Sequence, residues 1–245
     1  DKPGVKTKNI STIFRAADGS RGLTDALKRI RLEASQAIED GYTLIILSDR
    51  GVDRDNTYIP SLLATGAVHH HLIREGIRAK VGLIVESGEP REVAHFAALI
   101  GYGAGAINPY LAYETLLHLY ETGRVPSATG FDRIQNNYIK GINKGLLKII
   151  SKMGISTISS YKGAQIFEAV GLHEDLVDKY FTSTPSRIGG IGLEEIQADV
   201  VTLHQGAYRT DPSTANTDLS NQGFYYWRRD GEYHMWNPDT VALLQ

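Results

Sequence analysis

The sequence alternates between short apolar runs and longer amphipathic segments, and this alternation limits the possible folds more than any other feature. Thr43–Leu47 is a continuous run of β-branched and aliphatic residues, typical of a strand covered on both faces. Val81–Val85 repeats the pattern. Between these runs, segments such as Gly22–Glu39 carry apolar residues at three- and four-residue spacing, which predicts helices with one buried face. This order predicts β/α units and a parallel sheet.

The same pattern continues along most of the chain. Strands are predicted at Ser11–Arg15, Thr43–Leu47, Val81–Val85, Ala106–Asn108 and Ser156–Ser160. Helices are predicted at Gly22–Glu39, Ser61–Glu75, Pro90 to about Leu99, Leu111–Tyr120, Phe131–Met153, Gln165–Val170 and Leu193–His204. Such units fit a (β/α) barrel or a doubly wound sheet. We predict an α/β fold that is (β/α) barrel-like, an incomplete or irregular TIM-type barrel with parallel strands.

Polar residues follow the predicted strands at the edge where ligands of parallel sheets bind. Asp49 and Glu86 would suit acid/base chemistry if burial separated their pKa values. Because Arg50 follows Asp49 directly, a structural or interface role is favoured over catalysis. We assign no catalytic, cofactor-binding or metal-binding residue. The candidates for an interface with a neighbouring domain, or for the wall of a tunnel, are Ser48, Asp49, Arg50, Glu86, Ser87 and Asn108.

Composition excludes several classes of function. The chain of 245 residues has no cysteine, so it has no disulfide, thiolate metal site, iron–sulfur ligation or cysteine nucleophile. A formal net charge of -2 provides no basic face for nucleic acid. No apolar run approaches the roughly 18 residues of a membrane helix, and no signal peptide is recognisable. The chain begins at Asp1, which predicts a processed product or an excised fragment, with the cytosol as the default location.

Three further motifs have structural interpretations. Consecutive side chains of His69–His71 point about 100° apart on a helix, so they cannot converge on one metal ion. The glycine-rich turn Gly101–Gly105 follows a helix and precedes a strand, the reverse of a dinucleotide-binding loop. A basic stripe on the longest helix predicts a solvated face, with docking to an acidic surface as the alternative. It consists of Lys140, Lys144, Lys148 and Lys152.

Several long strings resemble the large subunit of the glutamate synthases. They are Ile46–Asp53, Ile59–Arg78, Val81–Leu116, Tyr138–Leu172 and Tyr180–Ile196. The similarity covers about residues 10 to 205 in the expected order. The aromatic stretch Gly231–Pro238 resembles the segment that leads into the flavin domain of that family.

The resemblance implies a place within a larger enzyme. Glutamate synthases combine a glutaminase domain, a central domain, an FMN-binding barrel and a β-helix. Ammonia from glutamine passes through a tunnel to 2-oxoglutarate at the flavin. By resemblance, residues 1–205 are the central domain, 206–222 a linker, and 223–245 the start of the segment leading to the FMN-binding domain. In the family, this central domain resembles the FMN barrel, binds no cofactor, links the two sites and helps to form the tunnel.

The sequence lacks the parts that carry the family's chemistry. The nucleophilic cysteine, the cluster-ligating cysteines and nearly all of the FMN barrel are missing, so the isolated chain is predicted to be inactive and without a cofactor. FMN and an iron–sulfur cluster are expected in the full-length enzyme. The predicted partners are the glutaminase and FMN-binding domains of the same polypeptide, with no nucleic acid and no membrane. The predicted location is the cytoplasm, or the plastid stroma in a photosynthetic eukaryote.

Two other functions remain open on the sequence alone. The chain is consistent with a free-standing barrel-type enzyme or ligand-binding domain that uses Asp49 and Glu86. It is also consistent with a module that docks a separate subunit through its aromatic tail and its lysine-bearing helix.

Overall fold

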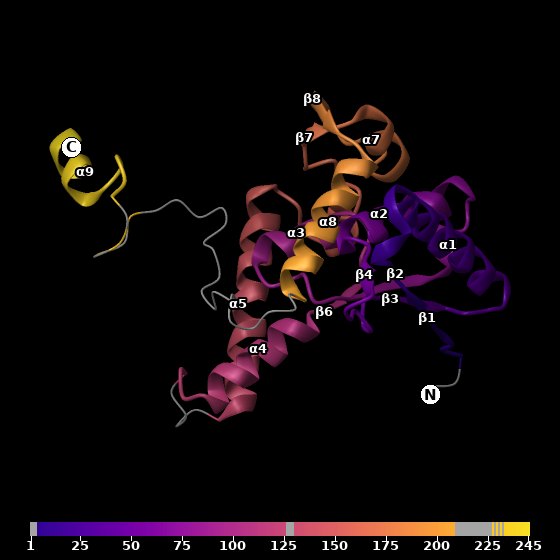
Figure 1. The fold of residues 1–245 in the computed structure, drawn as a ribbon, viewed down its shortest axis with the longest axis horizontal. Coiled ribbons are helices and arrows are strands. Elements are labelled where there is room, and N and C mark those ends of the chain that lie inside the picture. Colours follow the sequence, from indigo (N-terminus) through magenta and orange to yellow (C-terminus); the bar gives the residue numbers. More distant parts are fainter. Residues whose placement is uncertain (1–3, 126–129, 209–226, 228, 230, 232) are drawn as a thin grey trace. The chain divides into compact units, whose positions relative to one another are not determined.

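The computed structural model describes residues 4–125, 130–208, 227, 229, 231 and 233–245. The chain divides into two compact units, residues 1–208 and 209–245. Each unit is described by itself, and Figure 1 labels most of their helices and strands.

A parallel sheet forms the centre of the first unit. Its strands are β1 (Thr7–Ser11), β3 (Leu44–Ser48), β5 (Gly82–Glu86) and β6 (Ala106–Asn108). They pair in the order β1-β3-β5-β6, and every pair is parallel. The predicted α/β fold with a mainly parallel sheet is therefore confirmed. Among the residues that the structure describes, no strand closes the sheet into a barrel, because β6 pairs with β5 alone.

Helices connect consecutive strands and provide most of the core. They are α1 (Gly19–Glu39), α2 (Ser61–Arg74), α3 (Val93–Gly101), α4 (Tyr110–Glu121) and α5 (Phe131–Lys152), with short 3-10 turns η1 (Ala16–Asp18) and η2 (Arg78–Lys80). Helix α1 packs on α2, and α5 packs on α3 and α4. The core residues Leu27, Ile45 and Leu72 are fully buried. Burial of such a side chain stabilises the fold by about 1.5–3 kcal/mol.

The first predicted strand, Ser11–Arg15, is wrong in its placement. Strand β1 ends at Ser11, and Ile13–Arg15 forms β2, which pairs antiparallel with β4 (Asn56–Tyr58). Thr12 separates the two strands: its N–H donates to the Ser48 carbonyl, while its own carbonyl accepts from Ile59. Strand β1 escaped prediction because it is an edge strand, and its residues before Ile10 are polar.

The region after α5 departs most from the prediction. The segment predicted as a strand at Ser156–Ser160 instead leads into the short helix α6 (Ile158–Tyr161), because the Thr157 side chain accepts from the Ser160 N–H and caps it. The segment predicted as a helix at Gln165–Val170 is a loop that enters strand β7 (Ala169–Leu172). Left-handed backbone at Gln165, with φ 53°, is incompatible with a helix there.

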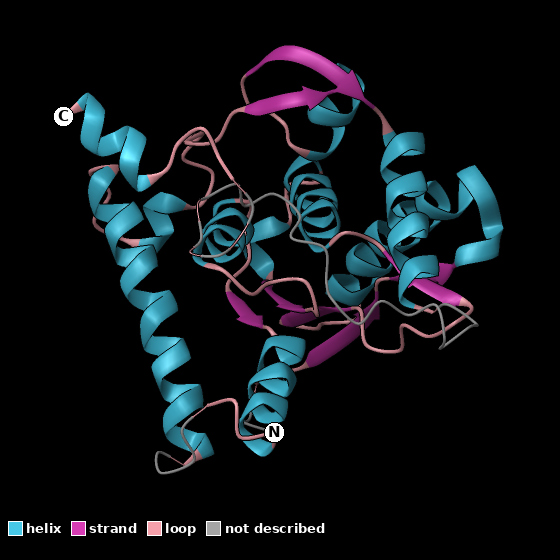
Figure 2. Cartoon of the chain, turned by 60° about the vertical axis from the view of Figure 1, so that its left-hand side comes forward, coloured by secondary structure: helices cyan, strands magenta, loops and turns pink. Residues whose placement is uncertain are grey.

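Strand β7 belongs to a second, small parallel ribbon, which Figure 2 shows apart from the main sheet. It pairs with β8 (Ser186–Ile191), and α7 (Glu174–Tyr180) connects the two strands. Helix α8 (Leu193–Ala207) follows and packs on α1. The other predicted helices and strands are confirmed within a few residues, although α3 begins at Val93 rather than at Pro90.

The second unit contributes one described helix, α9 (Pro238–Leu244). Asn237 caps it, because its Oδ1 accepts from the N–H groups of Asp239 and Thr240 at 3.0 Å. Trp236 and Tyr233 are exposed. Residues 209–222 of the predicted linker lie outside the described residues. Within the part that the structure describes, no helix is long and apolar enough to cross a membrane.

Candidate functional site

The carboxyl ends of β3, β5 and β6 bring the predicted residues together. Ser48 lies opposite Glu86 in the register, and Glu86 lies opposite Asn108. The Glu86 carboxylate accepts hydrogen bonds from Ser48 Oγ at 2.7 Å, Arg50 Nε at 2.9 Å and Asn108 Nδ2 at 3.2 Å. Burial opposes its ionisation, but the hydrogen bonds from Arg50 and Ser48 outweigh burial and hold the pKa of Glu86 below its usual value.

Asp49 forms the second, more deeply buried part of this strand-end cluster. Its side chain is 4% exposed and accepts from Ser87 Oγ at 2.6 Å and from the Gly88 N–H at 3.1 and 3.2 Å. Asp49 also lies close to Tyr110. Burial, followed by the interaction with Asp49, raises the pKa of Tyr110. Arg50 covers Tyr110, with its guanidinium carbon 4.1 Å from the ring centroid.

Residues that the sequence analysis did not select complete the cluster. Glu89 accepts from the Ser61 N–H at the start of α2, and burial raises the pKa of Glu89. Burial, followed by the charges of Glu89 and Asp49, raises the pKa of Tyr58 to about 12. Glu89 and Tyr110 each lie within three residues of a strand end, and that spacing is the signal by which they were detectable.

The geometry favours a structural role for Asp49 and Glu86, the two acids that the sequence suggested for proton transfer. Arg50 and Ser48 stabilise Glu86 as a carboxylate, whereas a general acid needs a raised pKa. Asp49 is held by side-chain and backbone donors of the following loop. The exposed component is Arg50, whose side chain is 50% exposed and lies 3.7 Å from Glu114. The cluster therefore presents charge at the surface and fixes the loops beneath it.

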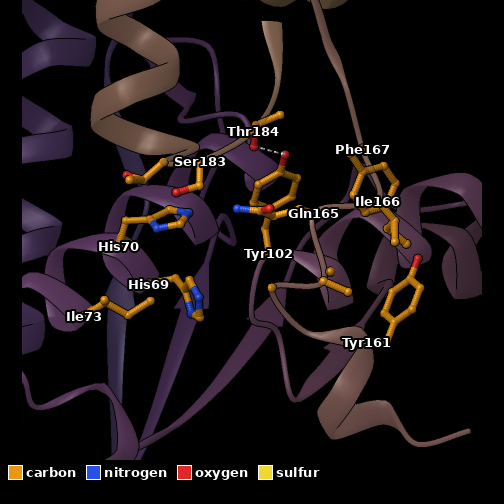
Figure 3. A pocket seen from close by; sticks show the side chains of 14 residues that line it. His69, His70, Ile73, Tyr102, Tyr161, Gln165, Ile166, Phe167, Ser183 and Thr184 are labelled. Carbon is orange, nitrogen blue, oxygen red and sulfur yellow. Dashed lines mark hydrogen bonds between the residues drawn. The ribbon is translucent and has the colours of Figure 1, made fainter. Parts of the chain in front are cut away.

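A cavity of about 250 Å³ lies at the opposite, amino-terminal side of the sheet. Figure 3 shows side chains from α2, from the glycine-rich turn and from two loops of the later region around it. The residues that face it include His69, His70, Tyr102, Gln165, Phe167 and Ser183. Within this cavity wall, the Tyr102 hydroxyl and Thr184 Oγ1 are 2.6 Å apart.

Two wall residues of the cavity have unfavourable backbone conformations. Gln165 and Ser183 have φ values of 53° and 67°, and they are the non-glycine residues with positive φ among the described ones. Such a conformation costs about 1–3 kcal/mol and is concentrated at functional sites. Sequence analysis missed both, since no pattern links these two loops to the histidines on α2.

The three adjacent histidines have separate environments, as predicted. His69 Nδ1 accepts from Arg78 Nε at 2.9 Å, and His71 Nε2 lies 3.0 Å from Ser35 Oγ. His70 Nε2 is buried without a hydrogen-bond partner. Burial, followed by the Arg78 charge, lowers the pKa of His69 to about 3; burial and Arg74 lower the pKa of His70 to about 4. No metal-binding group of three or more His, Cys, Asp or Glu side chains occurs in the described residues.

The glycine-rich turn has the predicted structural role, and the lysine stripe is exposed, as both of its predicted interpretations require. A Cβ at Gly103, where φ is +110°, would overlap the His69 ring, so the turn permits close packing against α2. The side chains of Lys140, Lys144, Lys148 and Lys152 are exposed along α5.

The sequence of this domain is similar to the sequences of known proteins. The family described as the glutamate synthase central domain matches residues 1–173. The chain belongs to this family. It is 47% identical over 243 residues to the glutamate synthase [NADPH] large chain of Bacillus subtilis (strain 168), covering 99% of this chain and 15% of that protein.

Further glutamate synthases match at similar identity. Glutamate synthase [NADH] of Schizosaccharomyces pombe is 42% identical, over 99% of this chain and 12% of its own length. The ferredoxin-dependent glutamate synthase of Pyropia yezoensis is 43% identical, over 96% of this chain and 16% of its own. The chain therefore spans between 12% and 16% of these relatives.

Among solved structures, a mutant flavocytochrome b2 with benzoylformate matches at 14% identity and a TM-score of 0.44. The match covers 68% of this chain and 41% of that one, and we infer nothing about the fold or function of this central domain from it.

Proposed function

We propose that this glutamate synthase central domain is a non-catalytic link between the glutaminase and FMN-binding domains of one long polypeptide. In this proposal, it helps to form the tunnel through which ammonia reaches the flavin site. The observation that carries the proposal is the family match, on a chain that spans only 12% to 16% of its relatives. FMN and the iron–sulfur cluster then belong to other parts of the full-length enzyme.

The strand-end cluster supports a linking role. Its buried acid, Asp49, orders the loop at Ser87 and Gly88, while Arg50 and Glu114 remain exposed above it. An ordered platform with an exposed arginine suits contact with a neighbouring domain, because arginine is enriched in protein interfaces. We therefore propose Ser48, Asp49, Arg50, Glu86, Ser87 and Asn108 as the residues that face or support this interface.

The proposal extends to the fold and the domain limits. The order of β1, β3, β5 and β6 places each strand beside the next one in sequence, as in a (β/α) barrel, and we propose that the sheet is an incomplete barrel. We propose the same domain limits as the sequence analysis, with residues 206–222 leading to the segment before the FMN-binding domain. The proposed location is the cytoplasm, or the plastid in photosynthetic eukaryotes; the spinach relative is named as chloroplastic.

Replacement of Arg50 by alanine in the full-length enzyme tests the linking role. We expect glutamine hydrolysis to exceed glutamate formation, because a disturbed domain contact releases ammonia to water. Arg54→Ala is the matched control, since Arg54 is exposed in the neighbouring loop and its side chain forms no hydrogen bond or ion pair within the described residues. A one-to-one ratio of the two activities in Arg50→Ala, equal to the control, would contradict the role of this contact.

The absence of a flavin site in this domain is tested separately. The 245-residue chain is incubated with excess FMN, desalted and examined by absorption spectroscopy. We expect no retained flavin. Flavin retained at about one per chain would mean that the strand ends form a working cofactor site, and the non-catalytic role would have to be withdrawn.

A further inference from the structure

The exposed side of helix α5 carries positive charge that the domain itself does not balance. Lys140, Lys144 and Lys148 recur every four residues, a spacing that places neighbouring side chains on one side of a helix. Residues 133–167 contain no aspartate or glutamate, although the whole chain has a formal net charge of -2. Within the described residues, the lysines of α5 form neither an ion pair nor a hydrogen bond.

Helix α1 shows how charge is balanced elsewhere in the domain. There, Arg29 forms an ion pair with Glu33 one turn later, with Nη1 and Oε1 3.2 Å apart. The positions three and four residues from Lys144 are occupied by a glycine, a leucine and two further lysines, Lys140 and Lys148. Like charges at this spacing destabilise a helix slightly. The lysines in the middle of α5 therefore contribute nothing to the stability of their own helix.

A leucine lies among these lysines. Leu147 is 66% exposed, more than any other leucine in the described part of the first unit. It follows Lys144 by three residues and Lys140 by seven, so the three side chains share one side of α5. The other side, which includes Ile142 and Ile150, is buried where α5 packs on α3 and α4 (Figure 1). Leu147 is therefore available for contact with another surface.

These features favour an acidic protein surface as the occupant. Unbalanced positive charge is complementary to carboxylates on a partner. A lipid bilayer would need a broad apolar face, but the apolar side of α5 is buried in the domain. Binding of single-stranded nucleic acid uses aromatic side chains for stacking, and the exposed side of α5 has none between Lys140 and Lys152. The matching surface presents aspartate or glutamate side chains around a shallow apolar depression.

The length of the relatives favours an occupant within the same polypeptide. The chain spans between 12% and 16% of the glutamate synthases that it matches, so most of such a protein lies outside it. Domains joined by a short peptide linker meet at an effective concentration of about millimolar. A contact built on exposed ion pairs, which are individually weak, is sufficient under those conditions. A separate protein would need the larger buried area of a stable complex.

We propose that the basic face of α5, formed by Lys140, Lys144, Leu147 and Lys148, docks on an acidic surface of another domain of the same polypeptide. Carboxylates of that surface pair with the lysines, and Leu147 fills a depression between them. The proposal rests on the proposed place of this chain within a longer enzyme, but it does not involve ammonia transfer. The Arg50→Ala test of the linking role can therefore fail while this contact exists, and the reverse also holds.

Zero-length cross-linking of the full-length enzyme with a carbodiimide tests the proposal, because this reagent joins an amine to a carboxylate only where the two are in contact. A denaturing gel then separates links within one chain from links between two chains, which double the mass. Mass spectrometry of the digested single-chain band identifies the linked residues. We expect Lys140, Lys144 or Lys148 to be linked to an aspartate or glutamate outside these 245 residues.

A double variant, Lys140→Gln with Lys144→Gln, tests whether charge holds the contact. It should lower the yield of the remaining Lys148 link about fivefold, as expected for the loss of two exposed ion pairs. Both positions are exposed, and glutamine is a good helix former, so the variant should fold. Lys80→Gln, at an exposed position of η2, is the matched control and should leave the yield unchanged.

Three results with the wild-type enzyme would overturn the proposal. If the lysines of the basic face form no link, the face is solvated. Links only to carboxylates within the 245 residues would mean that the domain balances its own charge. Links found only in the band of doubled mass would identify a second chain as the occupant. An unchanged yield of the Lys148 link in the folded double variant would also overturn it, since the contact would then not depend on charge.

Discussion

The two polar regions of the domain lie at opposite sides of one sheet and differ in how their hydrogen bonds are satisfied. In the strand-end cluster, Asp49 and Glu86 each accept from several donors of the domain itself. Around the cavity, the exposed side chains of Gln165 and Ser183 form no hydrogen bond within the described residues, and His70 Nε2 is buried without a partner. The strand-end acids therefore hold the fold, whereas the polar groups of the cavity wall do not.

The strand-end cluster and the cavity wall also differ in the free-energy cost of their buried polar groups. Buried polar groups that are fully paired rigidify a structure, whereas an unpaired one is a cost that a fold tolerates only for a reason. The cavity combines the buried unpaired His70 Nε2 with strained backbone at Gln165 and Ser183. Such a combination is expected where binding, rather than stability, determined the residues.

The largest effect is expected from Asp49→Ala. Removal of this carboxylate leaves Ser87 Oγ and the Gly88 N–H without their acceptor in a buried place, which should lower the free energy of unfolding by about 3 kcal/mol. Chemical denaturation of the 245-residue chain measures the change. The matching substitution at the cavity, Gln165→Ala, removes an amide with no partner and should change stability by less than about 0.5 kcal/mol. Equal losses in the two variants would abolish the distinction.

A smaller loss is expected from Gly103→Ala, which tests the support beneath the cavity. The new Cβ would overlap His69 Nδ1 at a backbone φ of +110°, so the His69–Arg78 contact must be displaced. We expect a loss of about 2 kcal/mol in the free energy of unfolding. Gly141→Ala, at a helix position with open space around it, should instead be stabilising by about 0.5–1 kcal/mol. A tolerated Gly103→Ala would show that this contact does not hold the cavity wall.

The strand-end cluster was predictable because sheet geometry places it. Once Thr43–Leu47 and Val81–Val85 are recognised as parallel strands, the residues after them must meet at one edge. The register then sets Ser48 beside Glu86 and Glu86 beside Asn108, as observed. Tyr110 and Glu89 were missed because their contacts depend on loop conformation, which short apolar runs do not determine.

The cavity was not predictable, because its wall comes from segments far apart in the sequence. His69, Tyr102, Gln165 and Ser183 lie on four segments, and no periodic pattern connects them. The region after α5 was also the place where secondary structure was mispredicted. There, a side-chain cap at Thr157 and left-handed backbone at Gln165 override the weak preference of the local sequence.

The smallest effect per residue is expected from pH, through the two histidines of the cavity wall. Burial holds the pKa of His69 at about 3 and that of His70 at about 4, against 6.5 for an unfolded histidine. Below pH 6.5 the unfolded chain therefore takes up protons that the folded domain does not, and stability falls as the pH is lowered toward 4. Both side chains are partly exposed, and solvent reduces the effect of their lowered pKa values. We therefore expect the free energy of unfolding to fall by about 1 kcal/mol for each histidine between pH 6.5 and 5.

The variant His70→Asn isolates the histidine contribution to this pH dependence. Its free energy of unfolding should fall less steeply between pH 6.5 and 5 than that of the wild type, measured by denaturant titration at each pH. Asn136→Ala, at an exposed position of α5 without a titratable side chain, is the control and should retain the wild-type slope. An unchanged slope in His70→Asn would mean that this imidazole takes up a proton as readily in the folded domain as in the unfolded chain. Burial would then not keep the His70 ring neutral, and the contrast between the cavity wall and the paired strand-end cluster would fail at this residue.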